Sequence, residues 1–351
     1  MNKLTILIKP VSSQCNINCS YCFYKDIVKT NEFSPKKMKA DTTINLIEKV
    51  FRYCDDKTII EFCFQGGEPL LAGLDFYNMF FKKVKKQNKR NQVCFTIQTN
   101  GLLIDEGWIK LFKENNFLVG ISLDGIKETH DFNRKSKNNG TFDQVIKNVN
   151  LLKINEINYN ILTVVTSNMI TYPKKIYTFY KKMNFEYVQF IPCLSFFGKS
   201  NGLKPKEYAQ FFSELYKIWS KDRKIHISLF EEIINIFFGQ RNCLSCGKLG
   251  YCSLQFVIET DGSVYPCDFY VLQKYCIGNI NNHSFDDLLK NTNVRKFLEE
   301  EKNFSYLCDT CKFYTICQGN CKRQNQCMFD DYYCGYQILL ENIYKDIIEG
   351  I

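Results

Sequence analysis

Three cysteines lie within eight residues near the start of the 351-residue chain, in the stretch QCNINCSYCFYKD at 14–26. The spacing C-x3-C-x2-C places Cys15, Cys19 and Cys22 in one short loop. Thiolates are ligands of iron–sulfur clusters and of zinc. A cluster of four irons has four corners, so three thiolates leave one iron open, as a catalytic metal does for its substrate. We expect a small molecule there, bound through an amine and a carboxylate.

A second group of cysteines lies toward the C-terminus, where eleven of the eighteen fall between Cys243 and Cys334 inclusive. Eight of them form a set of three and a set of five: Cys246, Cys252 and Cys267, then Cys308, Cys311, Cys317, Cys321 and Cys334. Eight thiolates suffice for two four-ligand clusters if one ligand crosses from the second set to the first, as happens in two-cluster ferredoxins. Two four-cysteine zinc sites that only stabilise a small domain fit the same count.

The histidines and the other cysteines restrict the possible kinds of metal site further. The three histidines are far apart in the chain, which argues against mixed Cys/His zinc sites: His130, His226 and His283. The other cysteines are interpreted as buried apolar residues or as spare thiols without a role: Cys54, Cys63, Cys94, Cys193, Cys243, Cys276 and Cys327.

The start of the chain has no secretion signal, so the thiols are expected to be reduced and the protein cytoplasmic. No apolar run approaches the ~18–20 residues of a membrane span. The net charge is +9, but no basic stripe interleaved with aromatics indicates nucleic acid, and no sustained heptad indicates an oligomer. We therefore expect a monomer that binds neither membrane nor nucleic acid.

The elements that must position the first cysteines alternate between strand and helix. Six apolar strands are predicted, at Leu4–Lys9, Thr58–Phe64, Val93–Gln98, Phe117–Leu123, Tyr159–Val165 and Tyr187–Leu194. Helical periodicity appears between them, as at 42–54 and 141–153. Such alternation predicts an α/β fold with a parallel sheet covered by helices. Six units are two short of a closed barrel, so a partial barrel and a doubly wound sheet both fit.

Turn-forming and polar residues follow each predicted strand. The cysteine stretch follows the first strand, and QGGEP (65–69), TNG (99–101), DG (124–125) and TSN (166–168) follow the next four. Because parallel strands share one end, these segments should meet there, where β/α folds carry their active sites.

The amino-acid composition of the chain changes after a predicted helical stretch at 196–240. The segment 254–271 carries Asp261-Gly262 between two alternating runs, which predicts a β-hairpin. We expect two domains, a barrel at 1–235 and a small cysteine-rich domain at 236–351.

The pattern C-x3-C-x-aromatic-C, with Tyr21 as its aromatic residue, resembles the signature of the radical S-adenosylmethionine (SAM) superfamily. The resemblance implies a partial (β/α)6 TIM-like barrel, a 4Fe–4S cluster on the three cysteines, and SAM at the open iron. It also implies a set of cofactor-binding residues: Tyr21, Gly66, Gly67, Glu68, Ser122, Arg134 and Leu194.

Each of these residues lies in a motif that matches the superfamily. GGEP (66–69) resembles the segment that meets the methionine amino group, and glycine there lets the backbone approach a ligand closely. By the same resemblance Ser122 in ISLDG contacts the ribose and Leu194 in IPCL the adenine. Arg134 in NRK would meet the methionine carboxylate, which a guanidinium binds well.

The C-terminal cysteines resemble the SPASM extension of radical SAM enzymes, which implies two auxiliary 4Fe–4S clusters and three clusters in all. The resemblance assigns one cluster to Cys246, Cys252, Cys267 and Cys321, and the other to Cys308, Cys311, Cys317 and Cys334. Over essentially the whole chain, FQGGEPLLAG, QTNGLLIDE and DGSVYPCDFYVL resemble anaerobic sulfatase-maturating enzymes.

This last resemblance implies a reaction. A 5′-deoxyadenosyl radical from SAM would remove a hydrogen atom from the β-carbon of a cysteine or serine in a sulfatase polypeptide, giving Cα-formylglycine. Asp268, directly after Cys267, would be the base, and Tyr24 would line the peptide cleft. The second electron would leave through the auxiliary clusters, and a reductant such as flavodoxin or ferredoxin would supply the first.

Two other functions stay open. Some SPASM enzymes make thioether or other crosslinks in ribosomal peptides, but they usually carry an N-terminal peptide-recognition domain for which Cys15 lies too near the start. A non-catalytic electron-transfer or zinc-stabilised binding protein would explain the C-terminal cysteines. It would not explain a three-cysteine loop with an open corner.

Overall fold

The fold is organised around one ten-stranded sheet with the strand order β12-β11-β10-β1-β2-β3-β4-β7-β8-β9. It is seen in a computed structural model that describes residues 3–25, 37–241, 245–248 and 250–350. The six predicted strands are present as β1 (Lys3–Ile8), β2 (Ile59–Phe64), β3 (Val93–Thr99), β4 (Leu118–Ser122), β7 (Tyr159–Val165) and β8 (Tyr187–Pro192). They are parallel and adjacent in chain order. A doubly wound sheet would reverse its order, so the partial barrel is confirmed and the alternative is excluded.

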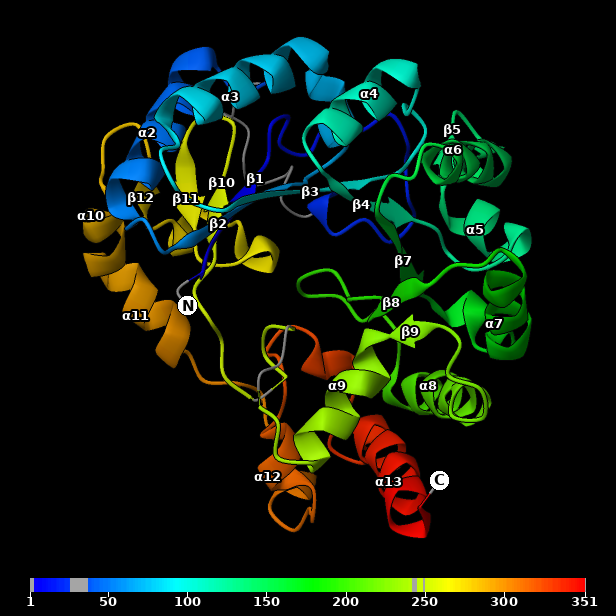
Figure 1. Cartoon of the computed structure of the whole chain (residues 1–351). Helices are drawn as coiled ribbons and strands as arrows, with labels where there is room; N and C mark the ends of the chain where they lie inside the picture. The colour runs from blue at the N-terminus through cyan, green and yellow to red at the C-terminus, as the bar shows by residue number, and fades with distance from the viewer. Residues whose placement is uncertain (1–2, 26–36, 242–244, 249, 351) are drawn as a thin grey trace.

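Helices cover the convex outside of this curved sheet (Figure 1). They are α2 (Ala40–Tyr53), α3 (Leu74–Gln87), α4 (Glu106–Glu114), α5 (Lys127–Asn133), α6 (Phe142–Ile154) and α7 (Pro173–Lys182). The outward strand residues Phe62 and Phe64 are fully buried and pack edge-on against Phe80 of α3. Each buried phenylalanine contributes about 1.5–3 kcal/mol. Since this core lies outside the sheet, the inner face is free for a site.

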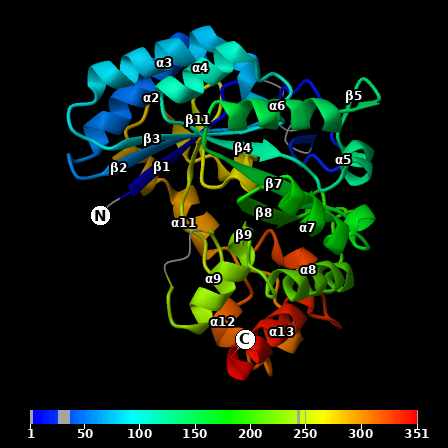
Figure 2. The same cartoon turned by 45° about the vertical axis from the view of Figure 1, so that its right-hand side comes forward.

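The predicted hairpin at 254–271 forms as β10 (Phe256–Ile258) and β11 (Ser263–Tyr265). Strand β10 also pairs in parallel with β1, so the hairpin extends the barrel sheet. The division of the chain at residue 235 stays a prediction. Below the barrel, α8 (Pro205–Trp219) and α9 (Ser228–Phe237) pack with the C-terminal helix α13 (Gly335–Glu349) (Figure 2).

The remaining elements are short. The strands are β5 (Lys135–Ser136), β6 (Asn139–Gly140), β9 (His226–Ile227) and β12 (Gly278–Asn279), and the helices are α10 (Phe285–Lys290), α11 (Thr292–Glu299) and α12 (Tyr314–Cys317). Single 3-10 turns occur at Pro69–Ala72, Ser167–Met169, Asp268–Tyr270, Gln273–Tyr275, Tyr306–Cys308 and Asn325–Cys327. None of the helices within the described ranges has the length and apolarity needed to cross a membrane.

The interior of the barrel is a cavity of about 2140 Å³, lined by residues of β1, β2, β3, β4, β7, β8 and β9 and of the cysteine-rich region. Closed (β/α)8 barrels fill this space with layers of branched apolar side chains. Here the inward positions of the strands include polar residues such as Thr96, Gln98, Asn160 and Gln189. The interior is therefore built to receive a polar ligand.

Candidate active site

The cysteine loop, residues 9–25, lies at the carboxyl end of the barrel strands and is held by the segment after β2. The amides of Gly67 and Glu68 donate to the carbonyls of Ser12 and Gln14, at 2.8 and 2.7 Å. A Cβ atom at Gly67 would lie 2.0 Å from the Gln14 carbonyl oxygen. At Gly66, whose φ is +127°, it would lie 2.5 Å from that of Ser12. Glycine is required at both positions so that the two loops can meet.

The other side of the cysteine loop is held by the segment that follows α5. Asn18 donates its amide to the carbonyl of Lys135 at 2.9 Å, and Ser20 donates its amide to that of Asn133 at 3.0 Å. The Ser20 hydroxyl also donates to Asn133 Oδ1 at 2.7 Å. Arg134 is therefore fixed against the cysteine loop by main-chain contacts on both of its neighbours.

The three cysteines of this loop all line the cavity. Burial raises the pKa of the Cys19 thiol to about 12 and also raises that of Cys15 and Cys22. Donors nevertheless point at the sulfurs, because Arg134 Nη1 lies 3.8 Å from Cys19 Sγ and Asn100 Nδ2 lies 3.7 Å from Cys15 Sγ. Cys19 is buried, Cys22 is partly buried and Cys15 is exposed. Thiols with donors aimed at them suit bound thiolates, whose charge a metal compensates. The loop thus fits an iron–sulfur cluster held by three ligands.

Asp124 organises the residues around the cysteine loop. It is fully buried, and its Oδ2 accepts from Tyr21 Oη at 2.5 Å and from Arg134 Nε at 2.9 Å. Its Oδ1 accepts from the amide of Val164 at 3.0 Å. Asp124 was not among the predicted site residues, although its Asp-Gly pair had marked this rim of the sheet. The carboxylate fixes Tyr21 and Arg134 relative to the sulfurs.

Five residues predicted to contact SAM line the cavity together with Tyr21: Gly66, Gly67, Ser122, Arg134 and Leu194. They come from the ends of β2, β4 and β8 and from the end of α5, so the fold brings them together at one rim. A guanidinium and a hydroxyl that can form hydrogen bonds, together with an apolar side chain, suit an amino acid joined to a nucleoside. Their individual roles stay predictions.

Glu68 is the exception among the predicted cofactor contacts. Its Oε1 accepts from Thr99 Oγ1 at 2.8 Å and from the amide of Leu70 at 3.0 Å, and its Oε2 accepts from the amide of Asn100 at 2.8 Å. The side chain is fully buried, and burial raises the pKa of its carboxyl to about 7. In this structure Glu68 joins the loops after β2 and β3.

Quartet A, consisting of Cys246, Cys252, Cys267 and Cys321, lines the lower part of the same cavity. Burial raises the pKa of both Cys252 and Cys267, and the charges of Cys246 and Cys321 add to each shift, so all four thiols are neighbours. Cys321 comes from the downstream set of five, as the predicted crossing requires.

Quartet B, consisting of Cys308, Cys311, Cys317 and Cys334, surrounds a separate small apolar cavity with Phe313 and Leu340. Burial raises the pKa of Cys317 and Cys334 to about 11 each. In the described ranges no three Cys, His, Asp or Glu side chains already converge at metal-ligand distances. The quartets are therefore groups of neighbouring thiols, and their role as ligands stays a prediction.

Asp268 follows Cys267 and faces the cavity within a buried ionic cluster. Its Oδ1 accepts from Tyr24 Oη at 2.9 Å and lies 2.8 Å from Lys9 Nζ. The Lys9 ammonium is fully buried, lies 3.7 Å from Glu259 Oε1, and sits over the Tyr24 ring at 4.4 Å. Lys9 and Glu259 were not predicted as site residues. The one available signal was a lysine ending an otherwise apolar strand.

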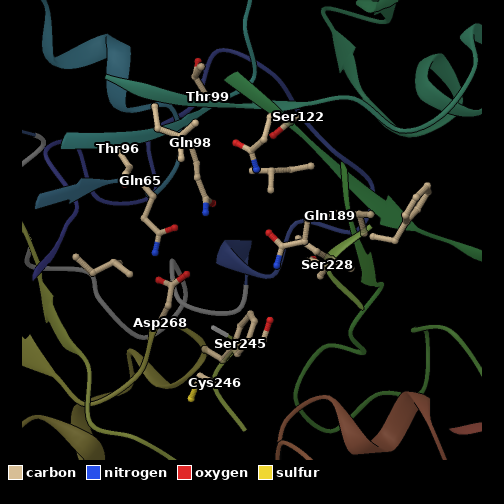
Figure 3. Close-up of a pocket in the computed structure, with 18 of the residues that line it drawn as sticks. Gln65, Thr96, Gln98, Thr99, Ser122, Gln189, Ser228, Ser245, Cys246 and Asp268 are labelled. Carbon is tan, nitrogen blue, oxygen red and sulfur yellow. The ribbon is translucent and has the colours of Figure 1, made fainter. Parts of the chain in front are cut away.

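Uncharged amides line the cavity opposite Asp268. Figure 3 shows the side chains of Gln65, Gln98 and Gln189 turned into the same central space as the Asp268 carboxylate. None of the three amides has a hydrogen-bond partner among the residues that the structure describes. A ligand with its own donors and acceptors would satisfy them.

Of the other described cysteines, Cys193 and Cys327 are buried, as expected, whereas Cys54, Cys63, Cys94 and Cys276 are only partly buried. The Cys327 thiol donates to the carbonyl of Cys193 at 3.2 Å, which joins the end of β8 to the C-terminal region. Cys94 lines the cavity. Cys243 lies outside the described residues.

Comparisons with known proteins agree with this arrangement. Residues 10–176 match the model of the radical SAM superfamily, and residues 250–312 match that of the SPASM iron–sulfur cluster-binding domain. A cysteine-type anaerobic sulfatase-maturating enzyme from Clostridium novyi is 43% identical, over 93% of this chain and 90% of that protein. A serine-type enzyme from Bacteroides thetaiotaomicron is 28% identical, over 97% of this chain and 88% of that protein.

A solved structure, native anSMEcpe with bound AdoMet and Kp18Cys peptide, is 35% identical with a TM-score of 0.88, covering 99% of each chain. The two matched domains and the AdoMet of that structure support SAM and 4Fe–4S clusters as the cofactors, with the auxiliary clusters in the SPASM domain. The chain therefore belongs to the anaerobic sulfatase-maturating enzymes of the radical SAM superfamily.

Proposed function

We propose that this enzyme oxidises a cysteine side chain of a sulfatase polypeptide to Cα-formylglycine. The observation that carries the proposal is the position of Asp268, which faces the same cavity as the three-cysteine loop and lies beside quartet A. The relatives support a cysteine target, since the one at 43% identity is of the cysteine type and the serine-type enzyme from Bacteroides is 28% identical.

The atoms and electrons of the reaction divide between cofactors and protein. Oxidation of the –CH2–SH group to a thioaldehyde removes two electrons and two protons, and water then replaces the sulfur, which leaves as sulfide. When bound, the SAM–cluster pair supplies hydrogen-atom abstraction from the β-carbon, and the auxiliary clusters accept the second electron. Asp268 takes the thiol proton, since a carboxylate facing the cavity can act as a general base.

The protein orients this base. Tyr24 and Lys9 both contact Asp268 Oδ1, so the carboxylate is held in one orientation. Its other oxygen has no partner among the described residues and can meet the substrate. Asp124 holds Arg134 and Tyr21 at the SAM end of the cavity. We assign the methionine carboxylate to Arg134, the ribose to Ser122 and the adenine to Leu194. Gly66, Gly67 and Tyr21 complete this pocket, with Glu68 acting through the loops that it joins.

The cavity suits a polypeptide. The unpaired amides of Gln65, Gln98 and Gln189 each offer a donor and an acceptor, which match the main-chain groups of an extended peptide. Because these amides are neutral, they would bind the main chain of the substrate peptide on either side of the target cysteine with little selectivity for the peptide's side chains. A volume of about 2140 Å³ leaves room for several residues beside SAM.

The remaining assignments complete the proposal. Cys15, Cys19 and Cys22 hold the SAM-binding cluster, and quartets A and B hold one auxiliary cluster each. A flavodoxin or ferredoxin supplies the reducing electron. The enzyme acts in the cytoplasm as a monomer.

The test is anaerobic reconstitution with iron, sulfide and SAM, followed by incubation with a short sulfatase peptide that carries the target cysteine. Mass spectrometry should show the loss expected for replacing CH2SH by CHO. The Asp268→Asn variant should keep its iron and lose almost all product. The exposed Asp286→Asn variant serves as the control and should keep wild-type turnover. Wild-type turnover by Asp268→Asn would contradict the base assignment, and an unmodified peptide with the wild-type enzyme would contradict the proposal.

A further inference from the structure

Lys302 lies where the loops that carry quartets A and B meet. Its Nζ donates to the carbonyl of Gly250, to that of Gln318 at 3.1 Å and to that of Asn320 at 3.4 Å. The two loops touch here, because a Cβ atom on Gly250, whose φ is +79°, would lie 2.3 Å from Gln318 Cβ. Lys302 therefore joins the segment before Cys252 to the segment between Cys317 and Cys321.

The side chain of Lys302 is in its charged form. A neutral amine has only two N–H groups, so donation to three carbonyls requires an ammonium. The Phe304 ring lies 5.6 Å from Nζ and covers one side of the group. Within the described ranges no carboxylate lies within ion-pair distance of Lys302, so its positive charge is not neutralised.

This charge acts on both quartets. Burial lowers the pKa of Lys302 below its usual value, and the charges of Cys252 and Cys321 of quartet A and of Cys317 of quartet B oppose this shift. Lys322 also acts on Cys252, but its Nζ is paired with Glu300 at 2.8 Å. Lys302 thus places a cation, with no carboxylate partner among the described residues, where the loops that carry the two quartets meet.

We propose that Lys302 raises the reduction potentials of both auxiliary clusters and so favours them as acceptors of the second electron of substrate oxidation. The inference rests on the proposed ligand assignment of the two quartets. An added electron increases the negative charge of a cluster, and a nearby cation that is only partly exposed to water stabilises that reduced form. In the balanced reaction, the hydrogen atom carries one electron away, Asp268 takes the proton, and the second electron passes through the clusters to a one-electron carrier protein.

Four variants of the full-length holoenzyme separate charge from structure. Lys302→Met removes the charge and the donors, whereas Lys302→Gln removes the charge and keeps an amide donor. Lys302→Arg keeps the charge. Lys312→Met is the matched control, because Lys312 is also near quartet B but is 61% exposed and paired with Glu341 at 3.6 Å. Each protein is reconstituted anaerobically, its iron is counted, and its clusters are titrated with redox mediators and followed by EPR.

We expect about twelve irons in every variant, for three clusters. Lys302→Met and Lys302→Gln should shift the auxiliary midpoint potentials to more negative values, and Lys302→Arg and Lys312→Met should leave them unchanged. The two neutral variants should also form less formylglycine per SAM cleaved.

Unchanged potentials in fully loaded Lys302→Met and Lys302→Gln would overturn the inference. So would loss of about four or more irons from all three Lys302 variants, which would show that the residue only joins the loops. Formylglycine formation by the wild-type protein in the same preparation reports separately on the proposed function. Unchanged potentials in an active enzyme therefore count against the role of Lys302 alone.

Discussion

Replacement of Lys9 by methionine tests the buried ionic cluster around Asp268. The Lys9 side chain is fully buried, the Glu259 side chain is 1% exposed, and the Asp268 side chain is 16% exposed. The Lys9→Met substitution keeps most of the side-chain volume but leaves the Glu259 and Asp268 carboxylates without their cation. Breaking a buried ion pair in this way costs about 3–5 kcal/mol, because a buried charge is left uncompensated.

This loss of stability can be expressed as a shift of the melting temperature. The entropy of unfolding is about 2.1 cal/mol/K per residue, which gives about 0.7 kcal/mol/K for a chain of this length. The cost of about 3–5 kcal/mol therefore lowers the midpoint of thermal unfolding by about 4–7 °C. Lys9→Met should also form less formylglycine per SAM cleaved, since Asp268 loses one of the two groups that orient it.

The control lies at the start of β1, the strand that Lys9 directly follows. Lys3 makes a pair with Glu61 at 2.9 Å, but its side chain is 51% exposed. Exposed pairs contribute about 0–1 kcal/mol, so Lys3→Met should lower the midpoint by about 1 °C or less. Adding Glu259→Gln to Lys9→Met should recover part of the loss, because it removes one of the unpaired charges. Equal midpoints for Lys9→Met and Lys3→Met, measured by anaerobic calorimetry, would refute this reasoning.

Three further predictions concern the clusters, SAM binding and pH. Cys321→Ala should lower the iron content from about twelve to about eight per chain, whereas Cys327→Ala should leave it unchanged, and equal counts would contradict the crossing ligand. Asp124→Asn should weaken SAM binding about 10–100-fold in anaerobic calorimetric titration, because Arg134 and Tyr21 lose a charged acceptor worth about 1.5–3 kcal/mol; unchanged affinity would argue against this role. Burial lowers the pKa of His130 to about 4. The unfolded chain therefore binds the proton first as pH falls below about 6.5, and the wild type should lose about 2 kcal/mol of stability between pH 7 and pH 5. The stability of His130→Gln should depend less steeply on pH, and an equally steep dependence would count against this assignment.

Much of the fold was predictable because its signals are local. The six strands are continuous apolar runs that end in Gly, Asn or Pro, and their observed bounds lie within two residues of the predicted ones. The hairpin was predictable for the same reason, since Asp261-Gly262 favours a tight turn. The choice between a partial barrel and a doubly wound sheet was not local. It depends on which strands pair, and six strand–helix units are compatible with both.

The grouping of the cysteines was predictable from their spacing together with the requirement for four ligands. The contacts of Lys9 were not. Lys9 meets Glu259 because β1 pairs in parallel with β10, which brings Ile8 beside Ile258 across 250 positions of the chain. A hairpin pattern does not show which strand its outer edge will join. Asp124 was missed for a related reason, since Tyr21 and Arg134 approach it from two other segments.

Glu68 shows contacts that its motif does not reveal. Its place in GGEP predicts a ligand contact, which stays a prediction, and in the structure its carboxylate accepts from Thr99, Asn100 and the amide of Leu70. The chemistry of a side chain can be predicted from its type, whereas its partners depend on the tertiary structure.

The measurement that tests the central claim most directly is the EPR spectrum of the dithionite-reduced holoenzyme with and without SAM. If the three-cysteine loop leaves one iron open to SAM, the added cofactor should change the signal of the wild-type protein. The change should disappear in Cys15→Ala, which loses a ligand of that cluster but keeps quartets A and B. A wild-type spectrum that does not respond to SAM, in protein that contains about twelve irons, would contradict the account.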